Sequence, residues 1–180
     1  MTESPHQPQT TTITIRDGDE RDAAAVMAIY NHEVLNGTAT LDLQTRTITA
    51  QQEWMREHQG ATPVIVAEHG GEVVGFASLT PFKERAAYRT TVENSVYVRP
   101  ASQGLGIGTR LLGEIIDRAR RLGYHSVIAR ITGDNAGSIA LHHRFGFELV
   151  GVEREIGRKF GQWLDVTELQ LLLDSSSRTD

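Results

Sequence analysis

The stretch that decides the fold reads Val96-Tyr97-Val98-Arg99-Pro100-Ala101-Ser102-Gln103-Gly104-Leu105-Gly106-Ile107-Gly108-Thr109. It begins with β-prone residues and leads through a glycine-rich loop directly into a helix that we expect to start near Gly106. Backbone N–H groups at a helix start are unpaired and lie at the positive end of the helix dipole, so they suit a phosphate or pyrophosphate. The stretch therefore predicts an anion-binding loop, with a plain strand-to-helix turn as the alternative.

Spacing excludes two common nucleotide motifs in this loop. A P-loop ends in Gly-Lys-Ser/Thr, but Thr109 directly follows Gly108 without a lysine. A dinucleotide fingerprint would need its last glycine at Thr109 or at Leu111, and neither position has one. The pattern that does fit is Gln-x-x-Gly-x-Gly, formed by Gln103, Gly106 and Gly108.

After the loop comes the clearest helix of the chain, closed by Gly123. Its apolar residues recur at spacings of three and four and line one face, at Leu111, Leu112, Ile115, Ile116, Ala119 and Leu122. A first helix is predicted over residues 22–35, with an apolar face made of Ala23, Val26, Met27, Tyr30 and Val34. A second helix is expected to open with the capping box Thr49 to Gln52 and to end near Gly60.

Strands are predicted on both sides of the loop. A first strand around Ile13 and Ile15 precedes a hairpin over residues 64–68 and 73–79, and a further strand covers residues 90–98. After the amphipathic helix follow a strand at 127–131, a short helix at 136–145 and strands at 147–152 and 164–173. This order predicts an α/β fold in which helices flank a mixed, mostly antiparallel sheet.

Length and composition predict one soluble domain. The 180 residues suit a single domain over residues 13–173, with a disordered leader at 1–12 and a flexible tail at 174–180. A net charge of −5 argues against a dedicated nucleic-acid binder, and no apolar run is long enough to cross a membrane. We therefore expect a cytoplasmic protein. The absence of cysteine excludes disulfides, thiolate metal ligands and a cysteine nucleophile.

The Gln-x-x-Gly-x-Gly pattern, between a strand and an amphipathic helix, resembles the acetyl-CoA motif of the GNAT family of N-acetyltransferases. Segment 133–147, led by Asn135 and ending in Gly146-Phe147, resembles the second cofactor segment of that family. Segments 29–32, 91–98 and 159–165 are similar to the phosphinothricin and methionine sulfone or sulfoximine acetyltransferases. The resemblance runs in consistent order over residues 13–173 and implies a GNAT fold.

The resemblance implies that acetyl-CoA is the acyl-donor co-substrate, with no metal. The strand backbone would bind the pantetheine arm, at Val96, Tyr97 and Val98. The loop amides would hold the pyrophosphate, at Gln103, Gly104, Leu105, Gly106, Ile107, Gly108 and Thr109. Asn135 and Ser138 would also contact the cofactor, and Asn135 additionally suits a helix N-cap. Between residues 99 and 130 six arginines outnumber two acidic residues, so part of this excess could attract the phosphates, unless it is simply solvated.

Acetyl transfer to an amine needs a group that takes up a proton, because an α-amino group with a pKa near 8 is mostly protonated at neutral pH. By resemblance Glu93 is the candidate base, directly or through water, provided that burial raises its pKa; the alternative is a solvent-facing glutamate. His142 stands where many relatives have a tyrosine that protonates the CoA thiolate. It is a candidate general acid, with a structural histidine as the alternative.

An amino-acid acceptor also needs a partner for its carboxylate, which a guanidinium matches best. Arg89, four residues before Glu93 on a strand-like run, would face the same side as Glu93; the alternative is a surface arginine. The pocket would be shaped by Tyr30, Lys159, Phe160 and Trp163, some of them from a second subunit of a homodimer. For Tyr30 a core position is the other interpretation.

The favoured hypothesis is an acetyl-CoA-dependent N-acetyltransferase that acetylates the α-amine of a small amino acid or analogue, such as methionine sulfone, methionine sulfoximine or phosphinothricin. The amine would attack the thioester directly, while backbone amides near Val98 polarise its carbonyl. One rival is a GNAT enzyme acting on a peptide N-terminus or a polyamine. The other is a non-catalytic acyl-CoA-binding sensor.

Overall fold

The computed structural model describes residues 12–173, so the predicted tail and all but the last residue of the predicted leader lie outside it. The elements are β1 (Thr14–Asp17), η1 (Glu20–Asp22), α1 (Ala23–Asn36), α2 (Ile48–Glu57), β2 (Val64–His69), β3 (Glu72–Pro81), η2 (Ala86–Tyr88), β4 (Thr91–Val98), η3 (Pro100–Ser102), α3 (Ile107–Arg121), β5 (Ser126–Thr132), α4 (Ala136–Arg144), β6 (Glu148–Lys159) and β7 (Gln162–Leu172). Within the described part of the chain, no helix has the length and apolar character needed to span a bilayer.

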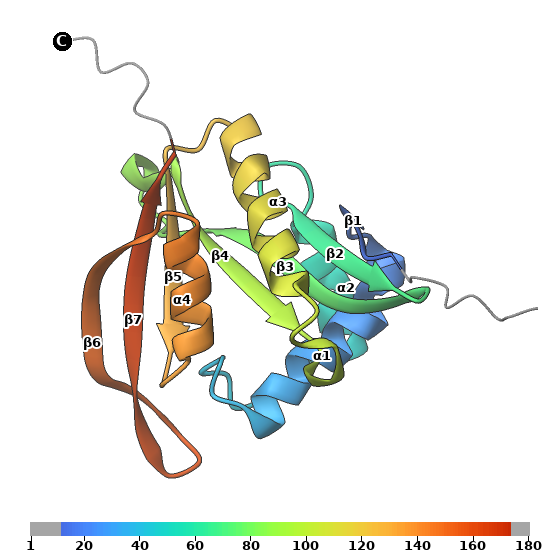
Figure 1. The fold of residues 1–180 in the computed structure, drawn as a ribbon, viewed down its shortest axis with the longest axis horizontal. Coiled ribbons are helices and arrows are strands. Elements are labelled where there is room, and N and C mark those ends of the chain that lie inside the picture. Colours follow the sequence, from blue (N-terminus) through green and yellow to red (C-terminus); the bar gives the residue numbers. More distant parts are fainter. Residues whose placement is uncertain (1–11, 174–180) are drawn as a thin grey trace, which may run out of the picture.

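The strands form one seven-stranded sheet in the order β1-β2-β3-β4-β5-β7-β6. Strands β4 and β5 pair in parallel, and the other neighbours pair antiparallel. Helices α3 and α4 cover one face of this sheet, and α1 and α2 cover the other (Figure 1). The predicted fold class, a mixed and mostly antiparallel sheet flanked by helices, is confirmed.

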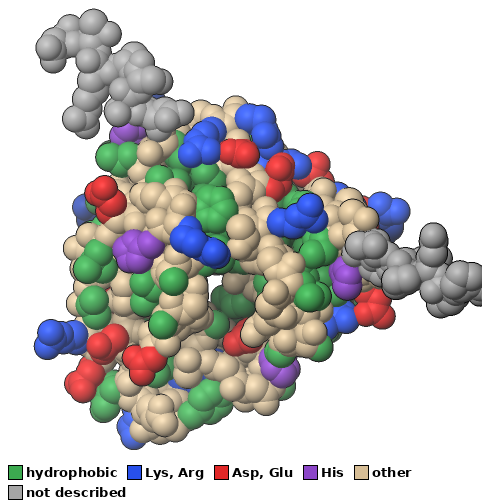
Figure 2. Space-filling view, in the orientation of Figure 1, with side chains coloured by type: hydrophobic (Ala, Val, Ile, Leu, Met, Phe, Trp, Pro, Cys, Tyr) green, Lys and Arg blue, Asp and Glu red, His purple; other side chains and the backbone are tan. Residues whose placement is uncertain are grey.

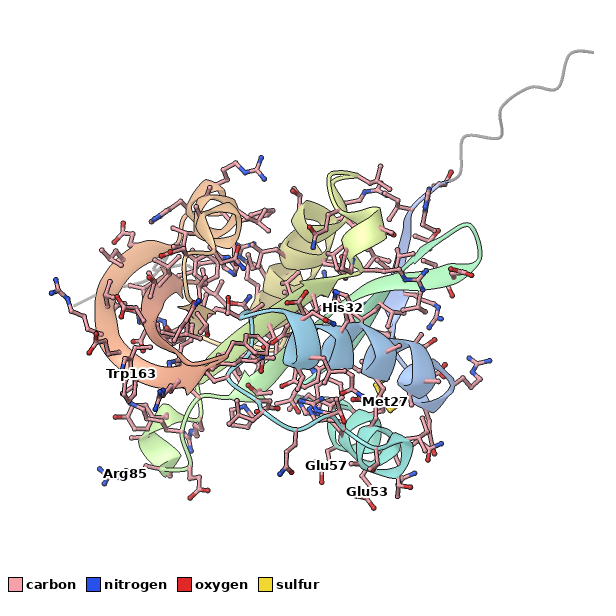
Figure 3. The ribbon with its side chains drawn as sticks, turned by 90° about the horizontal axis from the view of Figure 1, so that it is seen from below. Met27, His32, Glu53, Glu57, Arg85 and Trp163 are labelled. Atoms are coloured by element: carbon pink, nitrogen blue, oxygen red, sulfur yellow. The ribbon has the colours of Figure 1, made fainter. Side chains whose placement is uncertain are left out.

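Each face of the sheet has its own hydrophobic core. The larger core joins α3 to β2–β5 and β7, and the predicted apolar face of α3 is fully buried in it from Leu111 to Ala119. Leu122, predicted on the same face, is exposed at the end of the helix. The smaller core lies under α1 and α2. There the structure corrects the sequence analysis at one position of α1, because Ile29 is buried while Met27 is only half-buried between the two helices (Figure 3).

Helix α2 begins earlier than predicted. Thr47, in extended conformation, is the N-cap, and its Oγ1 accepts a hydrogen bond from the Ala50 backbone N–H at 3.2 Å. Thr49 therefore lies inside the helix and forms no capping box with Gln52. The sequence analysis named only Thr49, and the extended backbone of Thr47 is what makes Thr47 the cap.

The β6–β7 hairpin is longer than the sequence predicts. Strand β6 continues past Val152 to Lys159, and β7 begins at Gln162, so only Phe160 and Gly161 form the turn, both with positive φ. The added part of β6 is rich in charged, exposed side chains. It lacks the apolar alternation that identifies strands in sequence and is held by the backbone ladder to β7.

Gly75 on β3 allows α3 to approach the sheet closely. A Cβ atom at this position would lie 2.9 Å from the Tyr97 carbonyl oxygen and 3.1 Å from Leu111 Cδ1.

We expect Gly75→Ala to lower the free energy of unfolding by about 1–3 kcal/mol, because α3 and β4 must both move away from β3. Gly151→Ala on β6, where nothing lies within 4 Å, is the matched control and should be nearly neutral. Denaturant unfolding of both variants checks this, and equal effects would contradict it.

Candidate active site

The parallel ladder between β4 and β5 ends early. The two strands pair only from Thr91 and Ser126 to Glu93 and Ile128, although β4 continues to Val98 and β5 to Thr132. Beyond this point the strands diverge (Figure 1), while β4 stays paired with β3 on its other edge. The β5-facing backbone groups of β4 are thereby left available to an extended ligand.

A cleft of about 550 Å³ lies on the α3 and α4 side of the divergence. Its walls come from the end of β4, the loop before α3 and the start of α4, and Figure 2 shows a hollow near the middle of this face. The predicted cofactor residues that line it are Val96, Val98, Gln103, Gly104, Gly106, Ile107, Gly108, Thr109, Asn135 and Ser138. The structure thus brings together segments that lie up to 42 positions apart in the sequence.

The glycine loop has the conformation that its residues predict. Gly104 and Gly106 both have positive φ, at 79° and 76°, which a side chain would strain. Gly106 is the N-cap of α3, and this helix begins at Ile107, one residue later than expected. The first backbone N–H groups of α3 therefore lie at the cleft. They are at the positive end of the helix dipole, as an anion-binding site requires. Leu105 is exposed beside it.

Asn135 caps α4 at the other side of the cleft. Its Oδ1 accepts a hydrogen bond from the Ser138 backbone N–H at 3.0 Å. The N-cap interpretation is therefore confirmed, and both residues also line the cleft. These features fit a ligand with a pyrophosphate and an extended amide-bearing arm, and so they fit acetyl-CoA.

A narrow crevice of about 50 Å³ follows the divergence through the sheet. On the α4 side it is lined by Asn94, Val96, Ser138 and His142. Residues of β4 and β5 whose side chains alternate to the opposite face also line it, at Ser95, Tyr97, Arg130 and Thr132. The crevice therefore joins the cofactor cleft to the face of the sheet that carries α1.

Glu93 stands at the closed end of the divergence, on the face opposite the cleft. It is half-buried, and burial raises the pKa of its carboxyl, with Arg130 opposing this effect and Glu168 and Glu153 adding to it. Arg130 forms ion pairs with Glu153 and, at 3.9 Å, with Glu168. The pKa of Glu93 is thus shifted upward, which is the direction that its predicted role as a base requires.

His142 is almost completely buried beside the crevice, but its hydrogen bonds do not suit a general acid. Its Nδ1 lies 2.8 Å from the Ser138 carbonyl oxygen, and its Nε2 lies 3.1 Å from Asn94 Nδ2. A carbonyl only accepts, so Nδ1 carries the proton and Nε2 is the acceptor. Burial lowers the pKa of the imidazole, which keeps the ring neutral. These contacts favour the alternative interpretation, a structural histidine, over the proton donor that the resemblance implies.

Arg89 is exposed and lies outside β4, in helical conformation at the end of η2. The alternation that was expected to align it with Glu93 does not apply, because the strand begins only at Thr91. Arg89 therefore lies at the end of the sheet where β5 begins and β7 finishes.

Lys159, Phe160 and Trp163 lie at the opposite end, at the turn of the β6–β7 hairpin. The seven residues of β5 separate the two ends by about 20 Å. One copy of the chain thus does not bring Arg89 together with these three residues. Phe160 and Trp163 are exposed, and Figure 3 shows Trp163 on the hairpin, away from α2.

Lys159 and Tyr30 both hold the segment after α1. Lys159 is buried, and its Nζ donates to the backbone carbonyls of Glu33 and Thr40 at 3.1 and 2.9 Å. Burial lowers the pKa of this ammonium group. Tyr30 is also buried, with its hydroxyl 3.0 Å from Thr40 Oγ1 and donating to Asp42 at 2.5 Å. The core interpretation of Tyr30 is therefore confirmed, and Lys159 has a structural contact.

Comparisons with known proteins agree with this geometry. Residues 23–147 match the acetyltransferase (GNAT) family. The chain belongs to the GNAT family. The L-methionine sulfoximine/L-methionine sulfone acetyltransferase of Salmonella typhimurium is 43% identical over 169 residues, which cover 93% of this chain and 99% of that relative.

Two further relatives support this membership. The phosphinothricin N-acetyltransferase of Streptomyces coelicolor is 36% identical over 163 residues, covering 88% of this chain and 95% of the relative. The solved structure of a Salmonella typhimurium acetyltransferase with its cofactor acetyl-CoA superposes with a TM-score of 0.89 at 43% identity, covering 93% and 98% of the two chains. This GNAT protein is thus an N-acetyltransferase, as its sequence predicts.

Two residues at the GNAT site were not singled out by the sequence analysis. Arg130 was counted only within the arginine excess, whereas the structure places it in the crevice with Glu153 and Glu168. Asn94 was passed over, although it interrupts the apolar positions Val92 and Val96 on one face of β4. A polar residue at a strand position that should face the core is the signal in the sequence that could have identified Asn94.

Proposed function

We propose that this GNAT enzyme transfers the acetyl group of acetyl-CoA to the α-amine of a small amino acid or analogue, such as methionine sulfoximine, methionine sulfone or phosphinothricin. The observation that carries the proposal is the crevice between β4 and β5, which links the cofactor cleft to the face of Glu93. The names of the relatives at 43% and 36% identity support this acceptor class.

In this proposal acetyl-CoA supplies a thioester carbonyl carbon for attack by the amine. Glu93 takes up a proton from the ammonium group, directly or through water, so that the neutral amine can attack. Its partial burial makes it a stronger base than an exposed glutamate. Backbone N–H groups of β4 near Val98 polarise the carbonyl. The C–S bond breaks, CoA leaves as a thiolate, and the new amide nitrogen loses its second proton to water or to that thiolate. His142 supplies no proton.

The remaining predicted site residues keep these roles as proposals. The amides of residues 103–109 hold the pyrophosphate, the backbone of Val96, Tyr97 and Val98 binds the pantetheine arm, and Asn135 and Ser138 border it. Exposed Arg89, two residues before β4, binds the acceptor carboxylate. We also keep the expectations of one domain over residues 13–173, a cytoplasmic location, and independence of metal, nucleic acid and membrane.

The acceptor class is tested by a panel assayed for CoA release at saturating acetyl-CoA. Methionine sulfone, methionine sulfoximine and phosphinothricin should have kcat/KM values at least tenfold above those of unmodified amino acids, short peptides and a polyamine. A peptide or polyamine as the best acceptor would support the rival GNAT activity. Binding of acetyl-CoA without turnover of any acceptor would indicate a sensor.

The role of Glu93 is tested by the pH dependence of kcat/KM. Because its pKa is raised, activity should fall as the pH is lowered through a value above the usual range of a glutamate, since the protonated carboxyl accepts no proton. Glu93→Gln should remove this acid limb and lower the rate by about 10²–10⁴-fold. The control is Glu53→Gln on α2, where the side chain points away from the protein (Figure 3). An acid limb unchanged in Glu93→Gln would contradict the proposal.

We further propose that the enzyme is a homodimer formed through the β6–β7 hairpin. Seven large apolar side chains of this hairpin are exposed, at Leu149, Val150, Val152, Ile156, Phe160, Trp163 and Leu172. Strand β6 is also an edge strand, which favours pairing with or covering by another chain. A second copy would offer its own Arg89 or hairpin turn, which one copy keeps at opposite ends of the sheet.

The dimer is tested by sedimentation equilibrium. Val150→Asp should weaken self-association at least tenfold, because it places a charge among the exposed apolar side chains of the hairpin. Leu43→Asp, at a leucine after α1 that is even more exposed than Val150, is the control and should leave association unchanged. A wild-type protein that remains monomeric at micromolar concentration would overturn this part of the proposal.

A further inference from the structure

Asn94 has a buried polar atom that the fold leaves without a partner. The residue is only 5% exposed and points to the α4 side of β4, between Val92 and Val96. Its Nδ2 lies 3.1 Å from His142 Nε2, whereas its Oδ1 has no hydrogen-bond partner among residues 12–173. Buried acceptors are normally paired, so this oxygen calls for a donor from outside the chain.

His142 determines which atom of the Asn94 amide faces the ring. The Ser138 carbonyl oxygen, 2.8 Å from Nδ1, requires a proton on that nitrogen, and the neutral ring then has a lone pair at Nε2. Only the NH₂ group of Asn94 can satisfy this lone pair. The amide is therefore held with Oδ1 directed away from His142. The flipped amide would need a doubly protonated imidazole, which burial disfavours.

The position of Asn94 indicates the source of the missing donor. Asn94 lines the crevice, and its side chain lies on the same face of β4 as Val96 and Val98, which line the cofactor cleft. Glu93 faces the other side. The donor therefore comes from the cofactor side of the sheet, and the pantetheine arm of CoA has amide N–H groups of the required kind.

We propose, on the basis of the acetyl-CoA site assigned above, that Asn94 Oδ1 accepts a hydrogen bond from an amide N–H of the pantetheine arm. His142 is the positioning residue that holds the Asn94 amide in the accepting orientation. This gives the cofactor a side-chain contact in addition to the β4 backbone, and it assigns His142 a role in binding instead of proton donation.

Calorimetry with two ligands tests the contact. CoA contains the pantetheine arm, whereas adenosine 3′,5′-bisphosphate lacks it. Asn94→Leu should raise the Kd of CoA about five- to tenfold, the effect of one hydrogen bond, and leave the Kd of the bisphosphate unchanged. An unchanged Kd for CoA, or equal weakening of both ligands, would overturn the proposal. Asn94→Ala serves as a second variant if Asn94→Leu does not fold.

The positioning role of His142 is tested by substitution and rescue. His142→Leu cannot accept from Asn94 and should weaken CoA binding alone, whereas His142→Gln retains an acceptor and should keep the Kd within about twofold of wild type. His143→Gln, at the exposed neighbouring histidine of α4, is the control. Equal loss in His142→Leu and His142→Gln would contradict the role.

Nitrogen-15 NMR of the free enzyme reports which ring nitrogen of His142 carries the proton, and a histidine with a purely structural role is not bound to one tautomer. His142 should be the neutral Nδ1–H tautomer at pH 7, and an Nε2–H tautomer would overturn the proposed orientation. None of these measurements uses an amine substrate. The Asn94 contact can therefore be disproved while the acetyl transfer is confirmed, and it can be confirmed when the enzyme acetylates a different amine.

Discussion

The early end of the β4–β5 ladder is the constraint on which the rest of the site depends. Because the parallel strands separate after Glu93 and Ile128, one edge of β4 is free while its other edge remains fixed by β3. The same separation lets the start of α3 and the start of α4 border one cleft. It also opens the sheet, so that a ligand held on one face can react with a group on the other.

Burial acts in opposite directions on the two titratable groups at this opening. It raises the pKa of Glu93, which favours proton uptake from an amine, and it lowers the pKa of His142, which keeps the imidazole neutral. Both effects come from the removal of water around a charge. Position on the sheet thus separates a carboxyl with a raised pKa on the α1 face from a neutral, hydrogen-bonded histidine on the α4 face.

The β6–β7 hairpin connects the site to the rest of the molecule in two ways. At its turn Lys159 ties the end of α1 to the segment that follows, through the backbone carbonyls of Glu33 and Thr40. The hairpin therefore supports this segment, in which Ala39 lines the crevice. The hairpin also exposes seven large apolar side chains. In the homodimer that we propose, a second copy completes the acceptor pocket, since Arg89 and the hairpin turn lie at opposite ends of one sheet.

The sequence by itself determined the fold class, most elements and the cofactor loop, because apolar periodicity, glycine positions and capping residues are local signals. It did not determine that Thr47 caps α2, that β6 continues through a charged segment, or that Arg89 lies outside β4. These depend on backbone conformation and pairing. Only the tertiary structure placed Arg130 beside Glu93 and set Asn94 against His142, because a hydrogen bond between residues 48 positions apart leaves no local pattern.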